Sequence, residues 1–135
     1  KPKKIFMGKK DFQQLYLVKT YIEKKYKSKI VACKTIRNNK GLALSSRNLL
    51  LNSKEINKAI ILIKNISEFK KKLKNQKNIK KLMEQKKNQI KKILNTNIEY
   101  FELRNVKNLK ISNTIKDSNI FFAYYLNKIR LIDNI

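Results

Sequence analysis

The feature of this sequence that most constrains its fold is a strand, helix, strand pattern within the first 33 residues. Short apolar runs at residues 5–7 and 30–33 flank a segment whose apolar residues recur every three or four positions. These residues are Phe12, Leu15, Val18 and Ile22. Two strands joined through one helix run parallel, with a right-handed crossover. Because a parallel sheet of two strands does not stand alone, we expect its neighbours to lie elsewhere, a first indication that the chain is a fragment.

Residues 41–95 follow a different pattern, a polar loop and then two long helices. The first helix is predicted to begin near Asn52 or Ser53, because Glu55 follows Asn52 at the spacing of a capping box. Its apolar stripe consists of Ile56, Ala59, Ile60, Ile63, Ile66, Phe69 and Leu73. The stripe of the second helix consists of Ile79, Leu82, Met83, Ile90, Ile93 and Leu94.

After the second helix the hydrophobic period drops to two. Residues 98–103, 120–126 and 129–132 are predicted strands, and a tight turn at Asn127 and Lys128 joins the last two. Antiparallel pairing of these strands under the two helices predicts a small α+β domain. We therefore expect an α/β chain with two closely packed parts, residues 1–36 and residues 37–135.

Composition excludes several kinds of site. The chain has 135 residues, no His, and a net charge of +25 from 34 Lys and Arg against nine Asp and Glu. With Cys33 as its one cysteine, it cannot by itself form a serine-protease-type triad, a zinc site or a disulfide. The longest apolar run, residues 120–126, is much shorter than the roughly 20 residues that span a bilayer. We expect no membrane partner and a cytoplasmic location, where an unpaired thiol stays reduced.

The positive charge has a plain compositional explanation. Only four of the basic residues are Arg, and Lys, Asn and Ile, which have A/T-rich codons, make up nearly half of the chain. Proteins that read nucleic acids usually favour Arg and interleave aromatic residues, whereas residues 64–92 hold twelve Lys and one aromatic residue, Phe69. We interpret this stretch as a solvated helix surface, with a Lys-rich nucleic-acid-binding protein as the alternative.

One candidate site follows the first strand. Gly8, Lys9, Lys10 and Asp11 occupy the link between that strand and the first helix. Open α/β sheets bind ligands at this position, and the helix dipole favours phosphate there. The alternative is structural, because Asp11 and Gln14 also have the spacing of a capping box.

A second candidate site is the loop at residues 41–48. Ser45, Ser46 and Arg47 follow a glycine hinge at Gly41, and two hydroxyls with a guanidinium suit phosphate oxygens. An ordinary polar loop is the alternative. We interpret Cys33 as a small buried apolar residue at a strand end, not as a nucleophile.

In chain order, residues 6–15, 41–48 and 130–134 resemble the pantothenate synthetase family, the AMP-forming pantoate-β-alanine ligases. Residues 98–104 resemble the first strand of that family's C-terminal domain. The family belongs to the nucleotidyltransferases related to class I aminoacyl-tRNA synthetases, and residues 41–48 match its counterpart of their KMSKS loop. The resemblance implies that residues 1–36 end a Rossmann-like domain and that residues 37–135 form a C-terminal α+β lid. It covers the whole chain and is weakest in the Lys-rich helices.

The resemblance implies an enzyme that uses ATP and Mg²⁺. Pantoate and ATP would form pantoyl adenylate and pyrophosphate, and the amine of β-alanine would then displace AMP to give pantothenate. Gly8 and Asp11 would hold the ribose, Lys9 and Lys10 would also bind ATP, with Lys10 at the phosphates, and Gln14 would bind pantoate.

The resemblance assigns the remaining ATP contacts to two other segments. The backbone of Ile36 would contact adenine, and Leu44, Ser45, Ser46 and Arg47 would cover the triphosphate. Lys10, Ser45, Ser46 and Arg47 would be catalytic through charge stabilisation, which requires no protein nucleophile and no metal ligand from this chain. The full-length protein would be a homodimer.

The chain also departs from the family pattern. Lys9 replaces a usual Glu or Gln, Met7 a usual Phe and Lys34 a usual Pro. The family's His-x-Gly-His motif and its second pantoate-binding Gln are absent. We therefore expect a truncated or separately encoded piece that is inactive alone, and a non-catalytic remnant of the ligase is the further alternative.

Overall fold

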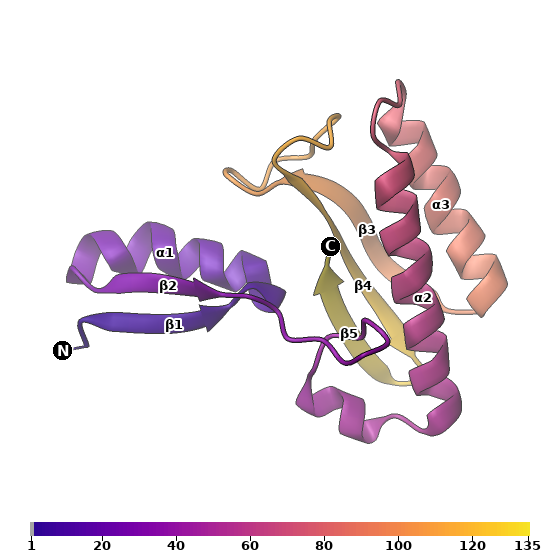
Figure 1. The fold of residues 1–135 in the computed structure, drawn as a ribbon, viewed down its shortest axis with the longest axis horizontal. Coiled ribbons are helices and arrows are strands. Elements are labelled where there is room, and N and C mark those ends of the chain that lie inside the picture. The colour runs from indigo at the N-terminus through magenta and orange to yellow at the C-terminus, as the bar shows by residue number, and fades with distance from the viewer. Residues whose placement is uncertain (1) are drawn as a thin grey trace. The chain divides into compact units, whose positions relative to one another are not determined.

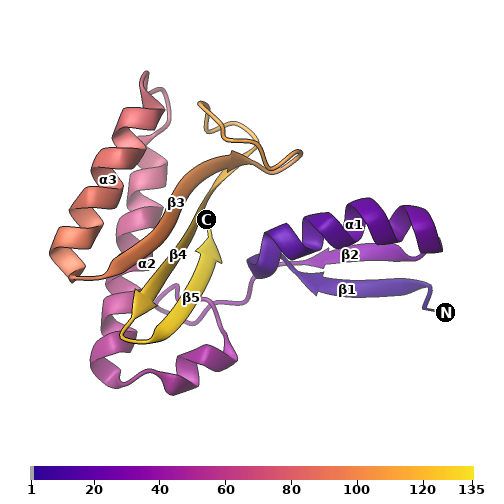
Figure 2. The same cartoon turned by 180° about the vertical axis from the view of Figure 1, so that it is seen from behind.

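The computed structural model describes residues 2–135, which divide into two compact units between Ile36 and Arg37 (Figures 1 and 2). Each unit has its own sheet. In chain order the elements are β1 (Lys4–Gly8), the short 3-10 helix η1 (Lys9–Asp11), α1 (Phe12–Tyr26), β2 (Lys29–Cys33), the 3-10 helix η2 (Ser46–Leu50), α2 (Ser53–Lys72), α3 (Ile79–Leu94), β3 (Asn97–Asn105), β4 (Ser118–Leu126) and β5 (Ile129–Asn134). Within residues 2–135, every helix is too short or too polar to cross a bilayer.

The first unit is the predicted strand, helix, strand motif. β1 and β2 are parallel, with Ile5 opposite Ile30 and Gly8 opposite Cys33. α1 lies along one face of this pair (Figure 1). Leu15 and Ile30 are the buried apolar side chains that join the helix to the sheet.

Two predictions for this unit are wrong. Asp11 is the N-cap of α1, but its side chain makes no capping hydrogen bond, so the capping box with Gln14 is absent. The preceding η1 turn leaves Asp11 at φ −88° and ψ 57°, outside the extended conformation from which a cap side chain reaches the first turn. Cys33 is exposed instead of buried, because it ends a strand in a sheet that α1 covers on one face only.

The second unit contains the predicted three-stranded antiparallel sheet, in the order β3-β4-β5. Each strand is longer than its apolar run, because polar residues at the ends continue the ladder. Asn127 and Lys128 form the predicted tight turn, with Leu126 paired to Ile129 and Asn127 at φ 51°. Helices α2 and α3 lie together on one face of this sheet (Figures 1 and 2).

The helices of this unit are positioned by a cap and an apolar face. Asn52 Oδ1 accepts from the Glu55 N–H at 3.0 Å, and Glu55 Oε2 accepts from the Asn52 N–H at 2.8 Å, which confirms the predicted capping box. A continuous row of rings joins α2 to the sheet, formed by Phe69, Phe101, Phe122 and Tyr124. Ile93 was expected in the core and is 61% exposed, because it lies about 100° around α3 from buried Leu94.

Candidate functional site

The first group of predicted site residues, here called the strand-end set, lies where β1 meets α1. Gly8 ends β1, Lys9–Asp11 form η1, and Gln14 lies exposed on the first turn of α1. A Cβ built on Gly8 would meet no atom within 4 Å, so a ligand has room to approach the backbone there. The structure therefore brings these five residues together at the carboxyl edge of a parallel strand pair, beside a helix N-terminus.

Ile36 follows the other strand of the pair, three residues beyond Cys33, which is opposite Gly8. It lies after β2, outside both strands, and its side chain is 70% exposed. Its predicted contact to adenine is through the backbone, and the residue is exposed.

The second group lies on residues 41–48, here called the Ser-Arg loop. Gly41 has φ +88°, a left-handed conformation that L side chains rarely adopt. Its N–H donates to the Asn38 carbonyl at 3.0 Å, and the Asn38 side chain accepts from the Leu42 N–H at 3.0 Å. Gly41 is therefore the end of a hydrogen-bonded turn, where the sequence predicted a hinge.

The tip of the Ser-Arg loop alternates between anchored and exposed residues. Ala43 is buried, and its carbonyl accepts from Asn48 Nδ2 at 2.9 Å. Ser45 Oγ accepts from the Arg47 N–H at 3.3 Å, which caps η2. Ser46 and Arg47 are exposed, as is Leu44. The loop thus presents a hydroxyl and a guanidinium to solvent from a backbone held by buried neighbours.

Sequence reasoning missed the residues that hold this loop. The Arg37 guanidinium donates to both carboxylate oxygens of Asp133 on β5, at 2.6 and 2.9 Å. It also donates to the carbonyls of Gly41 and Asn134, each at 3.1 Å. The one signal in the sequence was the family segment 130–134, which contains Asp133 but gives no indication of its partner.

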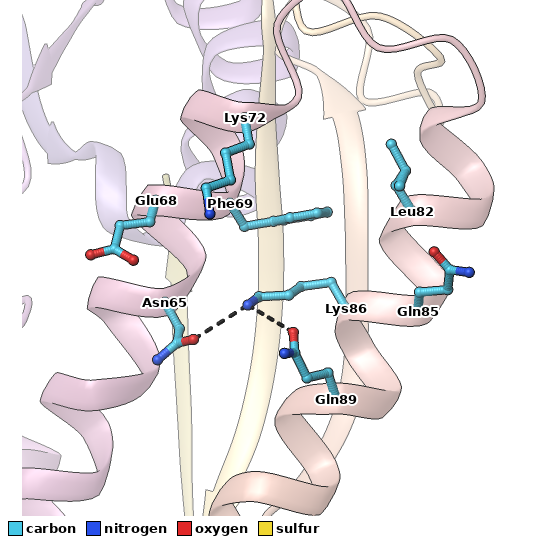
Figure 3. A pocket seen from close by; sticks show the side chains of 8 residues that line it. All are labelled: Asn65, Glu68, Phe69, Lys72, Leu82, Gln85, Lys86 and Gln89. Atoms are coloured by element: carbon cyan, nitrogen blue, oxygen red, sulfur yellow. Dashed lines mark hydrogen bonds between the residues drawn. The ribbon is translucent and has the colours of Figure 1, made fainter.

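A hollow of about 570 Å³ lies between α2 and α3 (Figure 3). Lys86 Nζ projects into it and donates to Asn65 Oδ1 at 3.3 Å and Gln89 Oε1 at 3.0 Å, 5.7 Å from the centre of the Phe69 ring. Burial, with the nearby charge of Lys72, lowers the pKa of Lys86. None of the predicted site residues lines this hollow. Because Lys86 on α3 donates to Asn65 on α2, we interpret it as a structural link between the two helices.

The Lys side chains of residues 64–92 lie mostly on the surface of α2 and α3. Nine of the twelve Lys in residues 64–92 are exposed, and only Lys70, Lys86 and Lys87 are half-buried. Lys70 donates to Asn119 at 2.8 Å, and burial lowers its pKa.

The chemistry open to the strand-end set and the Ser-Arg loop is anion binding. The strand-end set offers the ammonium groups of Lys9 and Lys10, and the Ser-Arg loop offers the Ser46 hydroxyl and the Arg47 guanidinium, groups that stabilise phosphate oxygens. Within residues 2–135 there is no group of three or more His, Cys, Asp or Glu side chains able to hold a metal ion.

Comparison with known proteins gives one consistent result. The sequence model of the family described as pantoate-beta-alanine ligase matches residues 1–135. The pantothenate synthetase of Flavobacterium psychrophilum is 36% identical over 138 residues, covering 99% of this chain and 49% of that protein. That of Clostridium botulinum (strain ATCC 19397 / Type A) is 39% identical over 143 residues, covering 98% and 48%. The chain spans about half the length of the curated relatives it matches.

Solved structures show the same fold. Pantothenate synthetase from Thermus thermophilus matches with a TM-score of 0.87 and 23% identity, over 99% of this chain and 49% of that one. Pantoate-beta-alanine ligase from Francisella tularensis, complexed with beta-gamma ATP and beta-alanine, matches with a TM-score of 0.68 and 30% identity, over 99% and 43%.

Proposed function

Because the chain belongs to the pantoate-β-alanine ligase family, we propose that it is the ATP-handling C-terminal portion of an enzyme that makes pantothenate from pantoate and β-alanine. The observation that carries the proposal is the Ser-Arg loop. Its exposed Ser46 and Arg47 lie on an anchored backbone, in a chain that the family model matches over residues 1–135. The solvent-facing guanidinium is the group best suited to bind two phosphate oxygens at once.

The proposed reaction has two steps. A carboxylate oxygen of pantoate attacks the α-phosphorus of ATP, and the bond to the β-phosphate oxygen breaks to release pyrophosphate. The amine of β-alanine then attacks the acyl carbon of the adenylate, loses a proton and displaces AMP. Negative charge builds on phosphate oxygens in the first step, so preorganised cations and donors lower its barrier.

Each residue group has a proposed part in the first step. In the strand-end set, Gly8 and Asp11 bind the ribose, Lys10, next to Lys9, faces the phosphates and Gln14 orients pantoate. Backbone groups of Ile36 contact the adenine. These assignments are supported by the position of the strand-end set at the carboxyl edge of a parallel sheet and at a helix N-terminus.

In the Ser-Arg loop, we propose that Leu44 and Ser45 shape the backbone over the triphosphate, while Ser46 and Arg47 contact its oxygens. Mg²⁺ bound to the phosphate oxygens of ATP would offset their charge, with no ligand from this chain. We place the enzyme in the cytoplasm, where its exposed Cys33 would stay reduced.

Complementation tests the proposal directly. The chain is mixed or co-expressed with the N-terminal half of the Flavobacterium psychrophilum relative, the part of that protein that this chain does not cover. We expect AMP release that requires pantoate, β-alanine and Mg²⁺ together, and no release from either half alone. AMP release that continues when pantoate or β-alanine is omitted would overturn the assignment.

A further inference from the structure

Arg37 is the first residue of the second unit, and its side chain contacts two separate segments of that unit. Its guanidinium contacts the carbonyl of Gly41 in the Ser-Arg loop, the Asp133 carboxylate, and the carbonyl of Asn134 at the end of β5. Residues 37 and 133 are 96 positions apart in the chain. A single planar side chain therefore connects the start of the loop to an edge strand of the sheet.

The chemistry of this contact requires an arginine. The Asp133 side chain is only 3% exposed and also accepts from the Asn134 N–H at 2.8 Å. A carboxylate this buried needs a paired cation, because desolvation otherwise disfavours its charge strongly. Arg offers a rigid fork that fills both oxygens and still leaves N–H groups for two carbonyls, whereas the ammonium of Lys is a point charge.

The contact is transmitted to the tip of the loop through short hydrogen bonds. Arg37 and Ala43 form an antiparallel bridge around the turn closed by Gly41. The carbonyl of Ala43 is in turn held by Asn48 at the far end of the loop. The backbone that carries Ser46 and Arg47 is therefore held at both ends. Asn48 binds Ala43, and Ala43 pairs with Arg37, whose side chain binds Asp133 on β5.

We propose that Arg37 and Asp133 are positioning residues that hold the Ser-Arg loop on β5 in the conformation that presents Ser46 and Arg47, before any nucleotide binds. That the loop acts on ATP rests on the proposed function. That the pair orders the loop is a property of the folded chain and is tested without ATP.

Amide hydrogen exchange on the 135-residue chain tests the ordering. In Arg37→Lys and in Asp133→Asn we expect the N–H groups of Leu42 and Asn48 to exchange about 10-fold faster or more, since a lost charged hydrogen bond of this kind is worth that much. Amides of β4 serve as the internal reference. The matched control is Arg130→Lys, which weakens an exposed Arg–carboxylate pair with Glu99 on the same sheet and should leave the loop amides unchanged.

Three outcomes overturn the proposal. They are unchanged loop exchange in both variants, equal acceleration of loop and β4 amides, and equal acceleration in the Arg130→Lys control. If Arg37→Lys does not fold, loop exchange in Asp133→Asn alone tests the proposal, because Asn leaves a neutral acceptor in the same place. The double variant should exchange no faster than the quicker single variant, because both changes break one interaction.

A second readout connects the pair to the reaction. In the complemented enzyme, Arg37→Lys should slow adenylate formation about 10-fold while the attack of β-alanine on supplied pantoyl adenylate changes little. An equal loss of rate in both steps would contradict the role of Arg37 in presenting the loop to ATP. If complementation yields no ligase activity at all, the exchange experiment still tests the ordering role, so failure of the proposed function and failure of this inference remain distinguishable.

Discussion

Gly8 and Cys33 are opposite each other in the register of β1 and β2, at the carboxyl ends of both strands. The one thiol of the chain is therefore next to the strand-end set, and it is exposed. Because a ligand held at Gly8 and Asp11 would cover this edge, Cys33 is a natural reporter of nucleotide binding.

We predict that ATP protects Cys33 from alkylation in the complemented enzyme. At an ATP concentration ten times its dissociation constant, the reaction of Cys33 with iodoacetamide should slow about 10-fold, since only the free protein reacts. Mass spectrometry measures the modified fraction over time. Asp11→Ala should reduce the protection, and equal rates with and without ATP would contradict a nucleotide site at this edge.

For Arg47 we predict a selective effect on the first half-reaction. Arg47→Ala in the complemented enzyme should slow adenylate formation about 10²-fold or more, roughly 3 kcal/mol, as when a preorganised charge donor is removed. The second half-reaction contains no triphosphate and should change much less. Rapid quench measures the two steps separately.

The control for Arg47 is Arg104→Ala. Arg104 donates to Glu102 at 2.7 Å on β3, so its removal also deletes a guanidinium from the second unit. It should leave both half-reactions close to their original rates. Equal losses in both steps for Arg47→Ala would mean that Arg47 supports the loop generally and does not bind phosphate.

Exposed apolar residues of the first unit predict self-association of the 135-residue chain. Phe6 on β1 is 67% exposed and Tyr21 on α1 is 66% exposed, in a unit whose sheet has two strands, both of them edge strands. The net charge of +25 opposes association, so it should increase as salt screens that charge. Light scattering should show aggregates at about 0.5 M salt, where the Debye length is only a few ångströms.

Phe6→Ser should reduce this aggregation. Ile61→Ser, which removes an apolar residue that is 45% exposed on α2, is the control and should have a smaller effect. A monodisperse chain that unfolds cooperatively at both low and high salt would argue against an open apolar sheet in the first unit.

The last prediction concerns Glu99 and the pH dependence of stability. Arg130 Nε and one terminal nitrogen bind the two oxygens of Glu99 at 2.7 and 2.9 Å, and this pairing lowers the pKa of Glu99 below its ordinary value near 4.5. Since the folded pKa lies below the unfolded one, the pair stabilises the fold above the unfolded pKa, and this contribution is lost as pH falls through the folded pKa.

An NMR titration of the Glu99 carboxyl measures this effect. Its pKa should be below 4.5 in the original chain and should return toward that value in Arg130→Gln. Glu102, whose partner Arg104 is unchanged in that variant, is the internal reference. An unchanged Glu99 pKa in Arg130→Gln would assign the shift to another cause.

Much of the fold is local and could therefore be predicted from the sequence. Periods of 3.6 and 2 in apolar residues located α2, α3 and the strands, and the Asn52–Glu55 cap marked the start of α2. The same reasoning failed at Asp11, where a short 3-10 turn changed the backbone, and at Ile93, because a period does not say how wide the buried face of a helix is.

The sequence by itself determined which residues are candidates for chemistry, because residue type and adjacency along the chain are enough to place Lys10, Ser46 and Arg47 on links between elements. Only the tertiary structure decided that Cys33 is exposed and that Gly41 closes a hydrogen-bonded turn. Above all, it decided that Arg37 binds Asp133. A contact across 96 residues depends on the register and order of strands, and local sequence patterns do not encode which distant side chains those strands bring together.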